Sequence, residues 1–264
     1  MSRRWGWSLR VIVLWLTVLA AACESGEPAP PSGSGSSPTS GTTSPSASPP
    51  PVPSEAVRFR AEDGLEIDGT VFGAGDVAVL LAHQSDQDQS NWFFFAEELA
   101  RRGYTAMTFT FRGYCPGGDG GCSEDGSAGS DGWMDVAGAV RLLRERGHER
   151  VYLTGASLGG AAVLRAAAER VPAAGVVSLS GVPLEPSGIA PGSLAGVRMP
   201  VLLVVGRFDG SLAQEVRRVY RNLPPPTELD ILPTGEHGTD LLEFTDDGLQ
   251  ERVRGLLFGF YGEP

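Results

Sequence analysis

A serine, an aspartate and a histidine are the residues of this sequence best suited to nucleophilic catalysis. Ser157 lies in the pentapeptide GASLG, Asp209 ends the segment GRFD, and His237 lies in GEHG. A serine hydroxyl is a weak nucleophile near neutral pH and needs a base to take its proton. A histidine can be that base, and a carboxylate can hold the imidazole in the required tautomer. Residues of these three types could together attack a carbonyl carbon, with the serine as nucleophile.

The pentapeptide around Ser157 lies between a predicted strand and a predicted helix, where such chemistry needs it. A serine on a sharp strand-to-helix turn is exposed, and Gly155 and Gly159 let neighbouring backbone pass close to it. The N-terminus of the following helix supplies free N–H groups that suit an oxyanion. The alternative is a tight turn in which the serine only caps the helix. Similarly, Asp209 could cap the next helix, and His237 could be a surface loop residue.

Strands alternate with helices along most of the chain. Continuous apolar runs such as residues 77–82 (VAVLLA) are typical of buried parallel strands, and several segments with helical periodicity end at glycine. The alternation predicts an α/β fold, with a mostly parallel central sheet and helices on both faces. Chemistry in such sheets gathers at the carboxyl ends of the strands.

The predicted elements begin with a β-hairpin over residues 56–72. The later strands are expected at 77–82, 104–111, 150–154, 175–179, 201–205 and 228–232. The helices are expected at 91–102, 133–146, 158–170, 212–222 and 239–260, with a glycine-rich loop over 113–132 and an irregular segment over 183–200. Ser127 and Ser130 would then be loop residues.

The strand, the GASLG turn and the helix, followed in order by Asp209 and His237, resemble the α/β-hydrolase family over residues 56–264. The family's order of nucleophile, acid and base implies Ser157 as the nucleophile, Asp209 as the acid and His237 as the base. The resemblance also implies that fold and a serine hydrolase that cleaves carboxylic esters or related acyl compounds through an acyl-enzyme. About 19 residues separate residue 179 from the approach to the next strand, so no substantial cap domain fits. The size and the His83-Gln84 loop are similar to the compact dienelactone-hydrolase-like branch, which often uses cysteine where this chain has Ser157.

An oxyanion hole needs two backbone N–H groups near the nucleophile. The N–H of Leu158 is one candidate. The family takes the other from the loop after the strand at 77–82, where relatives frequently have His-Gly and this chain has His83-Gln84. The resemblance therefore assigns the second donor to Gln84, with Ser85 as the alternative. His83 is expected to brace this loop by hydrogen bonding.

The composition limits the partners of the chain. It has 264 residues, with 21 basic residues, all of them Arg, against 32 acidic ones, a net charge of −11. A phosphate backbone would be repelled by such a charge, so we expect no nucleic-acid partner. The expected partner is a small-molecule acyl or ester substrate, and neither a metal nor an organic cofactor is required. Two alternatives stay open: a catalytically silent, surface-tethered binding domain, or the same triad used on peptide, thioester or C–C bonds.

The N-terminal sequence predicts a targeting segment followed by a flexible linker. Residues 1–22 combine a basic start with a twelve-residue, mostly apolar run, as in a signal peptide. The LAAAC segment ending at Cys23 resembles a bacterial lipoprotein cleavage site, which predicts lipidation of Cys23; an ordinary secretory signal is the alternative. Residues 23–54 are rich in Pro, Ser and Gly and predict a disordered linker before a hydrolase domain at 55–264. The expected location is extracytoplasmic, with the chain anchored to the bacterial cell membrane.

Two further cysteines flank the glycine-rich loop. Cys115 and Cys122 bound the segment CPGGDGGC. An exported protein meets oxidising conditions, so we expect a disulfide between them that stiffens a loop near the active-site face. Two free thiols or a metal pair are the alternatives.

Overall fold

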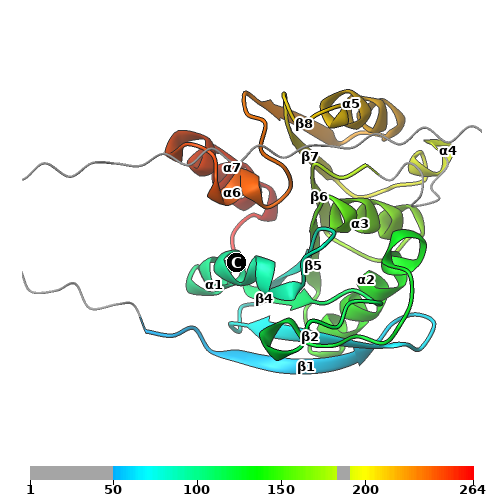
Figure 1. The fold of residues 1–264 in the computed structure, drawn as a ribbon, viewed down its shortest axis with the longest axis vertical. Coiled ribbons are helices and arrows are strands. Elements are labelled where there is room, and N and C mark those ends of the chain that lie inside the picture. Colours follow the sequence, from blue (N-terminus) through cyan, green and yellow to red (C-terminus); the bar gives the residue numbers. More distant parts are fainter. Residues whose placement is uncertain (1–49, 183–190) are drawn as a thin grey trace, which may run out of the picture. The chain divides into compact units, whose positions relative to one another are not determined.

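The computed structural model describes residues 50–182 and 191–264. The predicted signal peptide, Cys23 and the linker up to residue 49 lie outside the described residues. One sheet runs through the described part, in the order β1 (Ser54–Arg60), β2 (Glu66–Phe72), β4 (Thr105–Phe109), β3 (Val77–Ala82), β5 (Arg150–Ala156), β6 (Gly175–Leu179), β7 (Val201–Gly206) and β8 (Thr227–Leu232) (Figure 1).

The sheet is mostly parallel, as predicted. β1 and β2 form an antiparallel hairpin at one edge, β2 pairs antiparallel with β4, and every pairing from β4 to β8 is parallel. Every residue of β3, β4, β6 and β7 is buried, because apolar side chains on both faces of these strands pack under helices.

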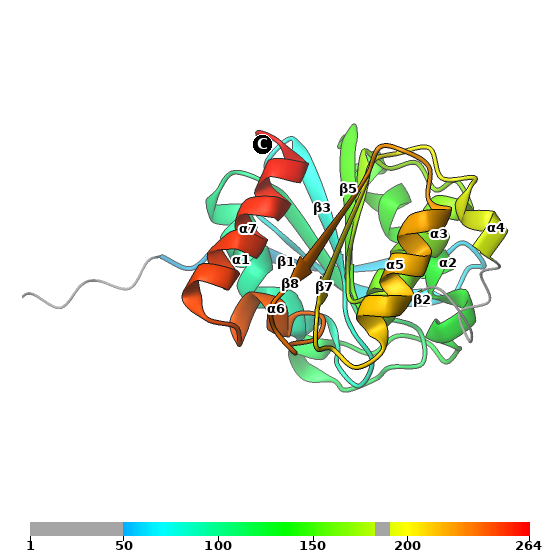
Figure 2. The same ribbon diagram turned by 90° about the horizontal axis from the view of Figure 1, so that it is seen from above.

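The helices lie on both faces of the sheet (Figure 2). One face packs against α2 (Ala128–Glu145), α3 (Leu158–Ala168) and α5 (Leu212–Asn222). The other packs against α1 (Phe93–Arg101), α6 (Asp240–Glu243) and α7 (Asp247–Tyr261). Short helices complete the described part: η1 (Gln89–Trp92), η2 (Gly118–Gly120) and α4 (Pro191–Leu194). Only 21 residues lie between the end of β6 and the start of β7, which confirms the expectation of no substantial cap domain.

Three segments differ from the predictions in more than the exact residues at their ends. α2 begins at Ala128, inside the predicted loop, so Ser130 is helical and Ser127 is the residue before the helix. The predicted C-terminal helix is two helices, because the carboxylate of Asp246 accepts a hydrogen bond from the backbone N–H of Leu249 and starts α7 anew. The segment predicted to be irregular contains α4, while its residues 183–190 lie outside the described part.

Within residues 50–182 and 191–264, the helices are too short or too polar to cross a bilayer. The predicted disulfide between Cys115 and Cys122 is present and closes the loop that contains η2.

Candidate active site

Ser157 sits on a strained turn between β5 and α3. Its φ of 50° and ψ of −110° are unusual for a residue with a side chain, and its backbone N–H donates to the carbonyl of Leu179 at 2.8 Å. Ser157 precedes the helix directly, yet its hydroxyl makes no capping hydrogen bond. The simple capping role considered from the sequence is therefore not what the hydroxyl does here.

Glycines make this turn possible by allowing contact between backbones. A Cβ added to Gly155 would lie 2.2 Å from the carbonyl oxygen of Gly159. A Cβ added to Gly159 would lie 2.1 Å from the carbonyl oxygen of Ala82 and 2.7 Å from that of His83. The first turn of α3 therefore rests directly on the loop that follows β3, and Ser157 is held against that loop.

We expect Gly159→Ala to destabilise the fold by about 1–3 kcal/mol, because a backbone carbonyl must move to admit the methyl group. Urea unfolding measures the loss. Gly255→Ala is the matched control, since Gly255 lies inside α7 with nothing within 4 Å of an added Cβ, and alanine should stabilise that helix by up to about 1 kcal/mol. Equal effects of the two substitutions would contradict the close approach of α3 to the loop.

Asp209 and His237 meet beyond the ends of β7 and β8. The Nδ1 atom of His237 and Oδ2 of Asp209 are 2.8 Å apart. The side chain of Asp209 is 12% exposed and that of His237 is 33% exposed, so the carboxylate is sheltered and the imidazole is open to a substrate. The N-cap residue of α5 is Ser211, so Asp209 is not that cap. With Nδ1 engaged by the carboxylate, Nε2 is the imidazole atom left for proton transfer.

The turn that carries Ser157 touches the loop that carries His237. Within the described ranges, the Ser157 hydroxyl makes no hydrogen bond to His237. The two loops nevertheless abut, since a Cβ added to Gly238 would lie 3.3 Å from Cβ of Ala156. Hydrogen bonds between catalytic groups are often long without substrate and tighten in the complex.

The loop after β3 and the first turn of α3 each carry a backbone N–H group without an acceptor in the described ranges. The N–H groups of Gln84 and Leu158 donate to no other residue in the described part of the chain. Leu158 is the first residue of α3, where the helix dipole adds partial positive charge. Both groups are free to bind an anion, as an oxyanion hole requires.

His83 braces this loop from inside the fold. Its Nε2 accepts a hydrogen bond from the backbone N–H of Phe111 at 3.0 Å, so the ring proton sits on Nδ1. Nδ1 then donates to the carbonyl of Gln84 at 2.7 Å, which fixes the peptide that carries the N–H of Ser85. The ring is fully buried, and this burial lowers the pKa of His83 to about 4.

The buried His83 makes stability depend on pH. The unfolded chain binds a proton at His83 near its usual pKa of 6.5, while the folded chain resists protonation until about pH 4. The neutral His83 therefore makes its full contribution to the free energy of unfolding above pH 6.5. As the pH falls toward 4, this contribution decreases by about 3 kcal/mol. Urea unfolding between pH 4 and 7 should show a steeper loss in the wild type than in His83→Gln. Parallel curves would contradict a neutral, buried His83.

A buried ion pair that no sequence pattern indicated begins one residue after Phe111, the backbone partner of His83. Arg112, the residue after Phe111, has a side chain only 2% exposed and lies 2.7 Å from the fully buried carboxylate of Asp135. It also pairs with Asp63 at 2.7 Å. Burial raises the pKa of Asp135, although the hydrogen bonds from Arg112 act the other way. No sequence signal marks such a pair, because charged residues at these spacings normally face solvent.

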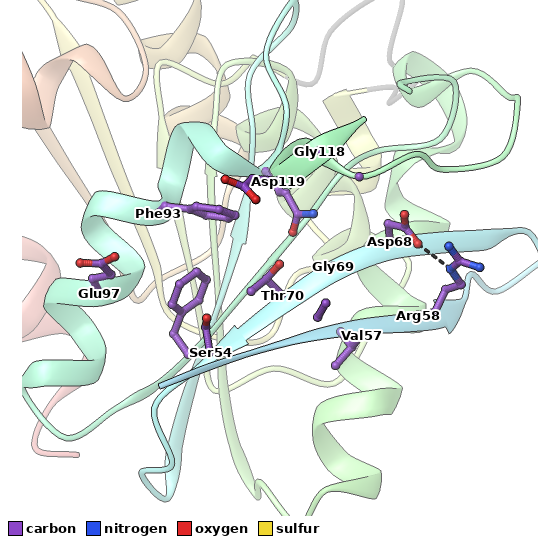
Figure 3. Close-up of a pocket in the computed structure, with 14 residues that line it drawn as sticks. Ser54, Val57, Arg58, Asp68, Gly69, Thr70, Phe93, Glu97, Gly118 and Asp119 are labelled. Atoms are coloured by element: carbon purple, nitrogen blue, oxygen red, sulfur yellow. Dashed lines mark hydrogen bonds and ion pairs between the residues drawn. The ribbon is translucent and has the colours of Figure 1, made fainter. Parts of the chain in front are cut away.

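A separate cavity of about 520 Å³ lies between the β1–β2 hairpin, α1 and the disulfide loop (Figure 3). Arg58 is paired with Asp68 at one end of it, and Phe93 and Glu97 line it from the other side (Figure 3). None of the three candidate catalytic residues lines it. In the ranges that the structure covers, no group of three or more His, Cys, Asp or Glu side chains could hold a metal ion.

Comparison with known proteins gives a consistent result. A family model described as "Alpha/beta hydrolase family" matches residues 73–258. An esterase from Pyrococcus furiosus superposes with a TM-score of 0.67 at 18% identity, covering 80% of this chain and 92% of its own. A dienelactone hydrolase from Anabaena variabilis gives 0.63 at 24% identity, covering 80% of this chain and 97% of its own. A monoacylglycerol lipase from Paleococcus ferrophilus gives 0.61 at 18%, with 75% and 99% covered. No curated protein matches the sequence.

Proposed function

Because this chain belongs to the alpha/beta hydrolase family, we propose that it is a serine hydrolase that cleaves carboxylic esters or related acyl compounds. The single observation that carries the proposal is the 2.8 Å contact between Asp209 and His237, on a loop that abuts the Ser157 turn. The names of the structural neighbours, two esterases or lipases and a dienelactone hydrolase, agree with ester hydrolysis.

Acylation begins with attack of the Ser157 Oγ on the carbonyl carbon of the substrate. Nε2 of His237 takes the hydroxyl proton, and Asp209 stabilises the imidazolium that results. The negative charge on the carbonyl oxygen is bound by the N–H groups of Leu158 and of Gln84, or Ser85 in its place. His237 then gives the proton to the departing alkoxide, so that an alcohol leaves and the acyl group stays on Ser157.

Deacylation repeats these steps with water. His237 removes a proton from a water molecule, which attacks the acyl carbon, and the same proton returns to Oγ of Ser157 as the carboxylic acid leaves. With few residues between β6 and β7 to build a cap, the site should be open, which suits small or accessible acyl groups.

A fluorophosphonate probe tests the proposal directly. The probe should label the purified chain at the peptide that contains Ser157, and p-nitrophenyl esters of graded acyl length should be hydrolysed. A folded chain with neither labelling nor turnover would support the binding-domain alternative instead.

We further propose that Cys23 carries the lipid that anchors the chain outside the bacterial cytoplasmic membrane. The support is the sequence pattern of residues 1–23. Cys23→Ser should release the chain from the membrane fraction of an expressing bacterium; retention there would overturn the anchor.

A further inference from the structure

The side chain of Gln84 joins the two loops on which the proposed chemistry depends. Gln84 lies in the loop after β3, and its Oε1 accepts a hydrogen bond from the backbone N–H of Thr239 at 3.2 Å. Thr239 follows His237 by two residues. A backbone N–H can only donate, so the amide oxygen of Gln84 must be the atom that faces it. The bond ties the oxyanion loop to the loop of the base, across 155 positions in the sequence.

Thr239, which donates this hydrogen bond to Gln84 from the loop of His237, is fully buried. Its hydroxyl lies 3.3 Å from Oε1 of Gln84 and 3.2 Å from Oδ1 of Asn91 in η1. The loop of His237 is thereby linked to two segments that lie near the start of the domain. A polar cluster of this kind holds its members in one arrangement, because a broken bond would leave a buried polar group without a partner.

Gly238 gives Gln84 the room to reach Thr239. Its φ is +58°, and a Cβ added to it would lie 2.1 Å from Oε1 of Gln84 and 3.3 Å from Cβ of Ala156. The backbone directly after His237 is therefore clamped between the Gln84 amide and the Ser157 turn. The imidazole of His237 is itself hydrogen-bonded to the carboxylate of Asp209.

We propose that the Gln84 side chain is a positioning residue for His237, which it acts on through Thr239. This inference rests on the proposed function. The imidazole is one-third exposed, so its own packing does not fix it. Asp209 orients the ring, and Gln84 fixes the backbone from which the ring projects. The departure from His-Gly thus has a physical consequence, since a glycine at residue 84 would offer the same backbone N–H but no tie to the base.

The test replaces Gln84 with methionine, which keeps the length of the side chain and removes the amide. A displaced base slows the chemical steps more than it weakens substrate binding. We expect Gln84→Met to lower kcat for a p-nitrophenyl ester by about 10- to 100-fold, with KM changed by less than about threefold. Gln87→Met is the matched control, because Gln87 is an exposed residue of the same loop; it should keep the wild-type kcat.

A second pair of variants separates positioning from general damage. In a His237→Ala background, Gln84→Met should cause almost no further loss, because there is no base left to position. An equally large loss of kcat in that background would overturn the proposal and assign the effect to the oxyanion loop. A wild-type kcat in Gln84→Met alone would also overturn it. Should Gln84→Met fail to fold, Thr239→Val removes the hydroxyl contact from the other side and should lower kcat by about 2- to 10-fold.

Failure of this inference differs from failure of the proposed function. If only the inference fails, the wild type still reacts with the fluorophosphonate probe and turns over esters. If the proposed function fails, the wild type does neither, and both proposals are overturned.

Discussion

Ser157→Ala should lower kcat/KM for p-nitrophenyl esters by about 10⁴- to 10⁶-fold and abolish labelling by a fluorophosphonate probe. The substitution removes the atom that would form the proposed acyl-enzyme. It should not unfold the chain, because the hydroxyl makes no capping bond and Ser157 is half-buried. Steady-state kinetics and mass spectrometry of the labelled chain measure the two losses, and circular dichroism checks that the fold is retained.

Ser130→Ala is the matched control for that experiment. Ser130 is exposed on α2, and alanine is the better helix former, so the variant should keep full activity and stability. Ester turnover by Ser157→Ala within about tenfold of the wild type would refute the nucleophile assignment, and any activity lost by Ser130→Ala would point to a second site.

Asp209→Asn should lower kcat by about 10³- to 10⁴-fold while leaving the fold intact. Nδ1 of His237 lies 2.8 Å from the carboxylate that keeps the ring proton on this nitrogen. An asparagine amide can donate its own N–H to Nδ1. The ring proton would then lie on Nε2, and Nε2 could no longer accept the proton of Ser157. The substitution also removes the negative charge that stabilises the imidazolium. Pre-steady-state kinetics would place the loss in the acylation step.

Asp230→Asn controls for the loss of a carboxylate in this region. Asp230 lies on β8, which leads to His237, and pairs with the half-exposed Arg252 at 2.8 Å. In the described ranges Asp230 has no hydrogen bond to His237, so this variant should stay close to wild type in kcat. If both Asp→Asn variants lose activity alike, Asp209 has no special relation to the base.

The sequence predicted the parts of the site that depend on local pattern. The GASLG turn, the strand before Asp209 and the strand before His237 are all local signals, and β3, β6 and α5 match their predicted bounds. The carboxyl ends of parallel strands share one edge of a sheet, so strand order alone indicated that these residues would come together.

The errors and omissions arise from contacts between distant segments. Gly129 and Gly132 favoured a loop over 113–132, yet both lie in α2. A Cβ on Gly132 would lie 3.0 Å from the ring of Phe111, so close packing, not flexibility, accounts for that glycine. The tie from Gln84 to Thr239 and the buried pair of Arg112 and Asp135 could not be predicted, because no local pattern records which polar groups meet inside a fold.

The distribution of the site across the sheet has a consequence for the order of assembly. Ser157 follows β5, whereas Asp209 and His237 follow β7 and β8, the two outermost strands at that edge of the sheet. All of these pairings are parallel and bring together residues distant in sequence, which form slowly during folding. A chain in which β7 and β8 have not yet paired would carry the proposed nucleophile, Ser157, without the proposed base, His237. Recovery of turnover after dilution from denaturant should therefore require that β7 and β8 have joined the sheet.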